Sequence, residues 1–189
     1  MLRKLTLAAA LFAPSAALAH PGHQAGSFLA GLGHPISGAD HILAMVAVGL
    51  WAAQMGGRAI WAMPATFVGA MVLGGAIGAA RLPFPAVESM ILASILLLGA
   101  VVALAARLPL KFALAMLALF GAAHGWAHGA EGSSGGLLTY AAGFAMMTAV
   151  LHGAGLGLGL ALQKLASMRL TRMLGAVTAA AGLAFVFGG

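Results

Sequence analysis

Two short stretches of the chain hold most of the side chains that could bind a metal ion. They are His34-Pro-Ile-Ser-Gly-Ala-Asp40-His41 and His124-Gly-Trp-Ala-His128-Gly-Ala-Glu131, which include four of the 7 histidines and two of the 3 acidic residues. The chain has no cysteine, which excludes thiolate ligands and iron–sulfur clusters. Imidazole and carboxylate ligands suit divalent first-row ions such as Ni(II), Co(II) or Zn(II). The residue types therefore predict a metal site with nitrogen and oxygen ligands.

The rest of the chain is strongly apolar. It is 62% hydrophobic and 6% charged, with a mean hydropathy of +1.06, which is typical of an integral membrane protein rather than a soluble domain. An ionisable side chain at membrane depth costs ~2.5–3.5 kcal/mol on insertion scales, so a group of them predicts a functional site. We therefore expect an all-α integral membrane protein whose partners are a metal ion and the lipid bilayer, with no nucleic acid.

The first nineteen residues have the pattern of a cleavable signal peptide. Arg3 and Lys4 precede a short apolar core, and Ala17-Leu18-Ala19 is a small-residue cleavage site. An uncleaved first transmembrane helix is the alternative. The prediction is a signal peptide at residues 1–19 and a single permease domain at residues 20–189.

Six apolar runs follow, each close to the length of about 20 residues that spans a bilayer as a helix. They are Ile36–Gln54, Ala59–Ala80, Ala86–Ala106, Leu110–Ala130, Gly136–Leu162 and Thr171–Phe187. The short loops between them predict one bundle of six transmembrane helices. Two sets of three helices would have opposite orientations, so a 3+3 inverted repeat is a further hypothesis.

Basic residues predict the orientation of this bundle. Loops on one side carry Arg58, Arg107, Lys111, Lys164, Arg169 and Arg172, whereas loops on the other side carry only Arg81. Positive charge favours the cytoplasmic side, so we expect a multi-pass protein of the bacterial inner membrane with a periplasmic mature N-terminus. Both motifs then lie in the outer half of the bundle.

Helical spacing predicts how the motif residues meet. On one continuous helix, His34 and His41 share a face about 10.5 Å apart, and Pro35 suits a first turn. His124, His128 and Glu131 form a single stripe at i, i+4 and i+7. We expect Asp40, His41, His128 and Glu131 to form the main metal site, with His34 and His124 above or beside it.

Four further polar residues are weaker candidates. Glu88 lies at the same predicted level, either as part of the site or as a partner of its helix N-terminus. His20, with the free amine of the mature N-terminus, and His23 are candidates for capturing metal, or simply a polar end. His152 lies further inward in the fifth helix, either as a lower position on a pathway or as a core histidine.

The two motifs resemble the signatures of the HupE/UreJ family of nickel permeases, H-x5-D-H and F-H-G-x-A-H-G-x-E. The resemblance covers essentially the whole chain, and Ala123 is the one departure, because the signature has Phe there. It implies that the motif histidines and carboxylates recognise the substrate. It further implies that the substrate is Ni2+ or, as a recurring ambiguity of the family, Co2+, and that the protein serves the maturation of nickel enzymes such as hydrogenase or urease.

These observations together predict a secondary transporter that takes up a divalent transition metal, and no enzyme or resident cofactor. No G-x-x-x-x-G-K-[ST] motif is present, so an ion gradient or the metal gradient would drive transport unless a separate ATPase component is used. One alternative is a zinc-dependent intramembrane hydrolase with Glu131 as its base, although the spacing is H-x3-H-x2-E rather than H-E-x-x-H. The other is a metal-binding sensor or accessory protein.

Overall fold

The computed structural model describes residues 26–131, 135–165 and 167–188, and within these ranges the chain forms helices and no strand. The predicted signal peptide and the candidate ligands His20 and His23 lie outside the described residues. The helices are α2 (Phe28–Ser37), α3 (Ala39–Met55), α4 (Ala59–Ala79), α5 (Val87–Ala103), α6 (Leu110–Glu131), α7 (Leu137–Lys164) and α8 (Met168–Gly188).

Every apolar run identified in the sequence coincides with helix, but the helices differ in length. Four of them, α4, α6, α7 and α8, are long and apolar enough to cross a membrane. The pair α2 and α3 passes the same test only when both are counted together, and α5, with 17 residues, is shorter. The described part of the chain is thus an all-α bundle with several membrane-spanning helices, and six spans remain a prediction.

The prediction of one continuous helix over Ile36–Gln54 is wrong. The chain bends by 85° between α2 and α3, where Gly38 is extended at φ −111° and ψ 127°. The Ser37 hydroxyl donates to the His34 carbonyl at 2.7 Å, an acceptor that a continuing helix would give to the Gly38 N–H. Pro35 lies near the end of α2 rather than in a first turn, because α2 already begins at Phe28 after its Ser27 N-cap.

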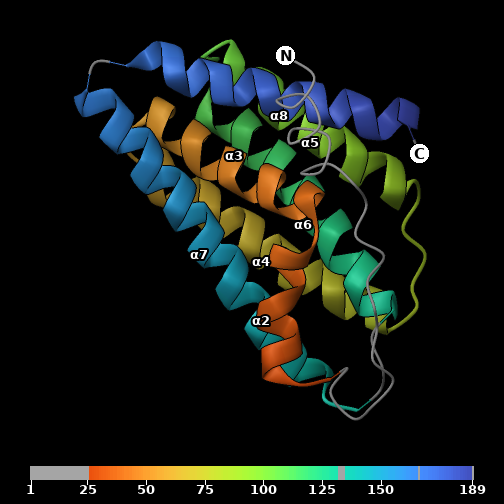
Figure 1. The fold of residues 1–189 in the computed structure, drawn as a ribbon. Coiled ribbons are helices and arrows are strands. Elements are labelled where there is room, and N and C mark those ends of the chain that lie inside the picture. Colours follow the sequence, from red (N-terminus) through yellow and green to blue (C-terminus); the bar gives the residue numbers. More distant parts are fainter. Residues whose placement is uncertain (1–25, 132–134, 166, 189) are drawn as a thin grey trace, which may run out of the picture.

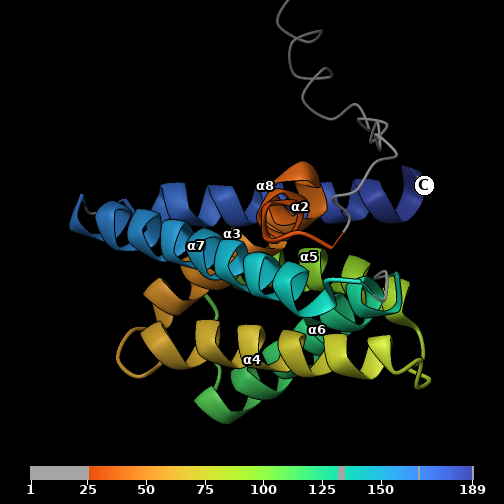
Figure 2. The same ribbon diagram turned by 90° about the horizontal axis from the view of Figure 1, so that it is seen from below.

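The helices pack as close pairs around α3. The most extensive pairs are α4 with α6, α5 with α8, and α3 with α7, while α2 lies against α7 (Figures 1 and 2). Helix α3 also contacts α4, α5 and α8, and its side chains Met45, Val48 and Trp51 are fully buried. Glycines bring the backbones together: a Cβ on Gly125 of α6 would collide with the Met71 carbonyl of α4.

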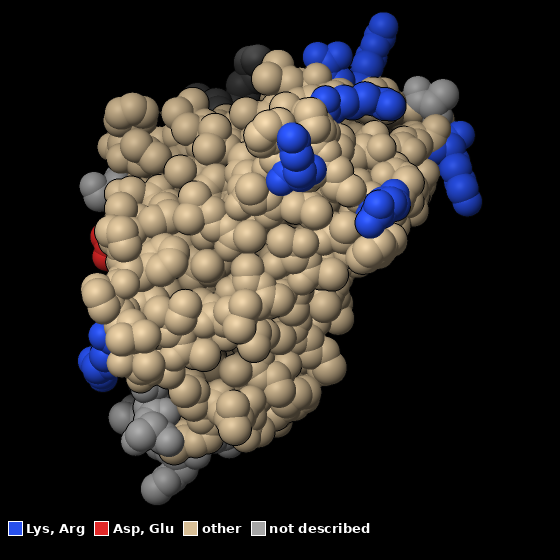
Figure 3. All heavy atoms as spheres, turned by 180° about the vertical axis from the view of Figure 1, so that it is seen from behind, with Lys and Arg blue, Asp and Glu red and all other residues tan. Residues whose placement is uncertain are grey.

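Charge is concentrated at one end of the bundle. Basic residues lie in or beside the connections that follow α3, α5 and α7. Figure 3 shows most of the lysine and arginine side chains gathered at one end of a broad surface with few charged side chains. His41, in the first turn of α3, and His128, in the last turn of α6, belong to the opposite end.

Candidate metal site

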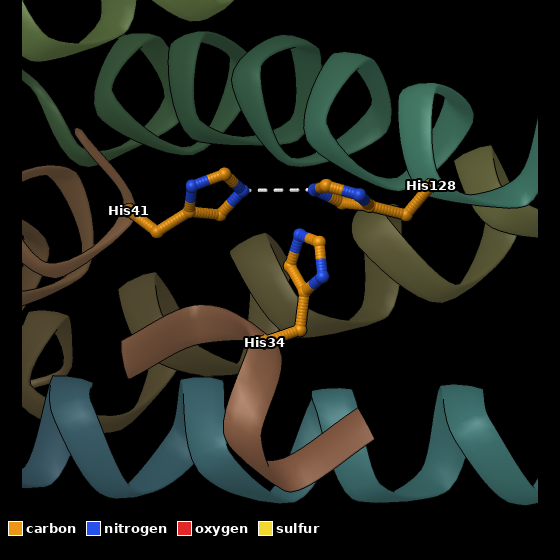
Figure 4. Close-up of side chains that lie close together, drawn as sticks. All are labelled: His34, His41 and His128. Carbon is orange, nitrogen blue, oxygen red and sulfur yellow. Dashed lines mark hydrogen bonds between the residues drawn. The ribbon is translucent and has the colours of Figure 1, made fainter. Parts of the chain in front are cut away.

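Three histidines from three different helices meet at this opposite end. His34 comes from α2, His41 from α3 and His128 from α6, and one nitrogen of each lies within 4.8 Å of the others (Figure 4). The rings of His34 and His128 have centroids 4.4 Å apart, and those of His34 and His41 are 5.5 Å apart. We call these three residues the outer cluster.

The Nε2 atoms of His41 and His128 face each other at 2.8 Å and share a hydrogen bond. One of the two nitrogens must therefore carry the proton, and the other offers a lone pair. Two imidazole nitrogens bound to the same ion at ~2.1 Å would lie roughly 3.0–3.4 Å apart. Only a small movement is thus needed for an ion to replace the shared proton.

A carboxylate lies on the outer side of each of these two rings. Asp40 Oδ2 is 3.0 Å from His41 Nδ1, and Glu131 Oε2 is 3.8 Å from His128 Nδ1. Neither Nδ1 atom makes an aligned hydrogen bond in the described structure, so these contacts are ion-pair approaches. A histidine that binds metal through one nitrogen commonly gives its other N–H to such a carboxylate, which sets the ring orientation and tautomer. In this geometry the two carboxylates stand behind the imidazoles and supply negative charge without occupying the centre of the cluster.

The bend between α2 and α3 explains how His34 reaches the cluster. Because α2 turns away from the axis of α3, the ring of His34 points into the space between His41 and His128 and lies nearer to His128 (Figure 4). On a continuous helix the two residues would share a face but stand two turns apart. The expected meeting of His34 and His41 thus occurs through a bend and not through helical periodicity.

His124 lies one turn deeper along α6 and has a different environment. It is fully buried, and its Nε2 is 3.0 Å from the Ser94 hydroxyl of α5. Ser94 donates its only hydrogen to the Ile91 carbonyl at 2.6 Å, so His124 Nε2 must donate to Ser94. The lone pair of His124 is therefore on Nδ1, which has no hydrogen-bond partner in the described structure.

Sequence reasoning missed the aromatic residues that enclose the cluster. The Phe144 ring of α7 lies 4.7 Å from the His128 ring and 5.6 Å from the His34 ring, and Tyr140 lies 6.0 Å from His34. A largely apolar pocket of about 140 Å³, lined partly by these two aromatics, reaches His128. Apolar residues on a membrane helix resemble lipid-facing ones, so no local signal identified them.

Two further positions from the sequence analysis, the candidate ligand Glu88 and the signature departure Ala123, are not among the residues of the outer cluster. Glu88 is exposed in the first turn of α5 and is not among the residues that form the outer cluster. Ala123, where the family signature has Phe, is completely buried, so this departure concerns packing and not a ligand.

A cluster of histidines at one end of an apolar helical bundle defines a multi-pass membrane protein with a candidate metal site. Residues 7–185 match the sequence model of a family described as HupE / UreJ protein. The chain is also 41% identical over 184 residues to Protein HupE of Rhizobium leguminosarum bv. viciae, covering 97% of this chain and 96% of that protein. It belongs to the HupE/UreJ family. No solved structure matches it.

Proposed function

We propose that this protein is a secondary transporter that takes up Ni2+, with Co2+ as the second candidate, from the periplasm into the cytoplasm across the bacterial inner membrane. The observation that carries the proposal is the outer cluster, in which two Nε2 atoms face each other at 2.8 Å with a third histidine within reach. The end that holds this cluster is opposite the basic loops, and the positive-inside rule assigns it to the periplasm.

An entering ion would bind where the proton is now shared. The ion replaces the hydrogen bond between His41 and His128 and is then bound by neutral imidazoles, with His34 as a third ligand. The carboxylates of Asp40 and Glu131 offset part of its charge from behind the rings. Because metal and proton compete for the same nitrogens, protonation weakens binding and favours release.

The geometry favours transport over the hydrolase alternative. A general base must face the water that the metal activates. Glu131 instead lies on the Nδ1 side of His128, its carboxylate 3.8 Å from that nitrogen, and its side chain is 76% exposed. Glu131 therefore suits charge compensation better than base catalysis, and we propose that the protein is not an enzyme.

Flux into proteoliposomes tests this function. We expect the wild-type protein to admit Ni2+ and Co2+ to an enclosed fluorescent chelator, and His41→Gln and His128→Gln to reduce the rate at least tenfold. Thr139→Val, an exposed change at the start of α7, is the matched control and should keep the wild-type rate. Equal rates for all four proteins, at matched reconstitution, would refute the proposal.

A further inference from the structure

His152 of α7 is a buried histidine that has no hydrogen-bond partner in the described part of the chain. It is only 1% exposed, and neither of its ring nitrogens has a hydrogen-bond partner among the described residues. Leaving a buried polar group unpaired lowers stability. A residue that serves only to fill the core would avoid this cost with an apolar side chain, so the free nitrogens of His152 call for another explanation.

His152 lies further along the bundle than the outer cluster. It follows Phe144, which packs on that cluster, by eight residues of α7, a distance of ~12 Å along the helix axis toward the basic end. Helix α3 approaches it closely, because a Cβ on Gly49 would collide with the His152 carbonyl. His152 is therefore an interior residue at greater depth, and not a lipid-facing one.

A row of rings connects His152 to the outer cluster. The centroid of His124 is 5.4 Å from that of His41, and Phe67 of α4 is 5.7 Å from His124. The same Phe67 ring is 5.1 Å from His152 and almost perpendicular to it, at 86°. The two buried histidines thus contact the same phenylalanine, and each has at least one ring nitrogen without a hydrogen-bond partner among the residues that the structure describes.

Thr148 of α7 and Met71 of α4 supply two further atoms that could bind a metal together with His152. Thr148 lies one turn earlier on the same face of α7 and is fully buried. Its hydroxyl donates to the Met71 thioether of α4 at 3.7 Å. An imidazole, a hydroxyl and a thioether form a sparse ligand set. Such a set suits transient binding, because conduction requires an ion to leave each position as readily as it enters.

We propose that His152 forms an inner metal-binding position, which an ion reaches from the outer cluster by way of His124 and past the ring of Phe67. The proposal rests on the transport function proposed above, but it assigns a separate site to residues outside both sequence motifs. The imidazole of His152 is its principal ligand, and Thr148 and Met71 are auxiliary ones.

Cobalt binding to the purified full chain tests the inner position directly. His34→Ala/His41→Ala/His128→Ala removes the outer cluster, and this triple variant should retain weak Co2+ binding with visible imidazole–cobalt absorption. Adding His152→Leu should weaken that binding at least tenfold, whereas adding Thr178→Val, a buried polar change in α8, should not. Equal binding with and without His152, or no binding by the triple variant at millimolar Co2+, would overturn the proposal.

Flux measurements separate this inference from the proposed function. In the otherwise wild-type chain, His152→Leu and His152→Gln should lower Ni2+ flux at least tenfold while Co2+ affinity at the outer cluster stays within twofold. Unchanged flux in two variants that remain monodisperse would also overturn the inference. If the wild-type protein moves no metal but cobalt binding still depends on His152, the transport function fails and the inner position stands.

Discussion

The carboxylates beside the two facing imidazoles differ in their distance from the ring and in their exposure to water. Asp40 Oδ2 is 3.0 Å from His41 Nδ1 and its side chain is 34% exposed, whereas Glu131 Oε2 is 3.8 Å from His128 Nδ1 and its side chain is 76% exposed. Water competes more strongly for the exposed group, so its interaction is weaker. At the scale of single residues, Asp40 therefore contributes more than Glu131 to the orientation of the site.

This difference predicts unequal effects of removing each charge. Asp40→Asn should lower Ni2+ affinity by about 10–100-fold, the usual loss when the carboxylate behind a metal-binding histidine is removed. Glu131→Gln should lower Ni2+ affinity less, because the Glu131 carboxylate lies 3.8 Å from His128 Nδ1 and its side chain is largely exposed to water. Calorimetric titration of both variants with Ni2+ measures the difference, and equal losses would contradict the assigned roles.

At the scale of the helices, the bend at Gly38 holds the outer cluster together. Gly38 separates α2 from α3 and lies beside the residues that orient the site. A Cβ added there would collide with Asp40 Oδ1 and lie 3.1 Å from His41 Nδ1. The backbone of Gly38 is extended and accessible to any residue, so a larger residue there would be accommodated by movement of the Asp40 and His41 side chains.

Gly38→Ala should therefore lower Ni2+ affinity at the site while changing the stability of the fold little. The added methyl group displaces the Asp40 carboxylate from His41, and we expect Ni2+ affinity to fall about tenfold, within the range for loss of such a carboxylate, with little change in melting temperature. Gly33→Ala in α2 is the matched control, because a Cβ there meets nothing within 4 Å. If the two variants bind Ni2+ equally, the contact at Gly38 is not important for the site.

At the scale of the whole molecule, the three most extensive helix pairs follow the symmetry that an inverted repeat predicts, whereas the contacts of α3 with α4 and α5 have no counterpart of similar extent at α6 among the described helices. Exchanging α3 with α6, α4 with α7 and α5 with α8 converts the three most extensive pairs into one another. However, the first motif lies at the beginning of α3 and the second at the end of α6. The exchange therefore does not relate the two motifs, and the site is built from unequal ends of the two halves.

The orientation of the bundle can be tested because the chain has no cysteine. Arg81→Cys and Lys164→Cys each place one thiol in an exposed position, between α4 and α5 and at the end of α7. The positive-inside rule predicts that a membrane-impermeant maleimide labels Arg81→Cys in spheroplasts. Lys164→Cys should react only after permeabilisation, and the reverse pattern would place the outer cluster on the cytoplasmic side.

The helical regions and the family could both be recognised from the sequence. Hydrophobic runs are local, and five of the six each coincide with one helix in the structure, whereas the first contains the break at Gly38. Helix order and orientation also predicted that His41 and His128 lie at the same level, and their rings meet in the structure. The helical regions and the family depend on residues close together in the chain, where composition and periodicity carry the information.

The internal arrangement of the site was decided only by the tertiary structure. The bend at Gly38 returns His34 to the cluster, Ser94 of a separate helix determines which nitrogen of His124 is free, and Phe67 links that histidine to His152. Each of these contacts joins helices distant in sequence. Their packing depends on glycines that let backbones touch, and on side-chain directions across interfaces that no periodic pattern within one helix specifies.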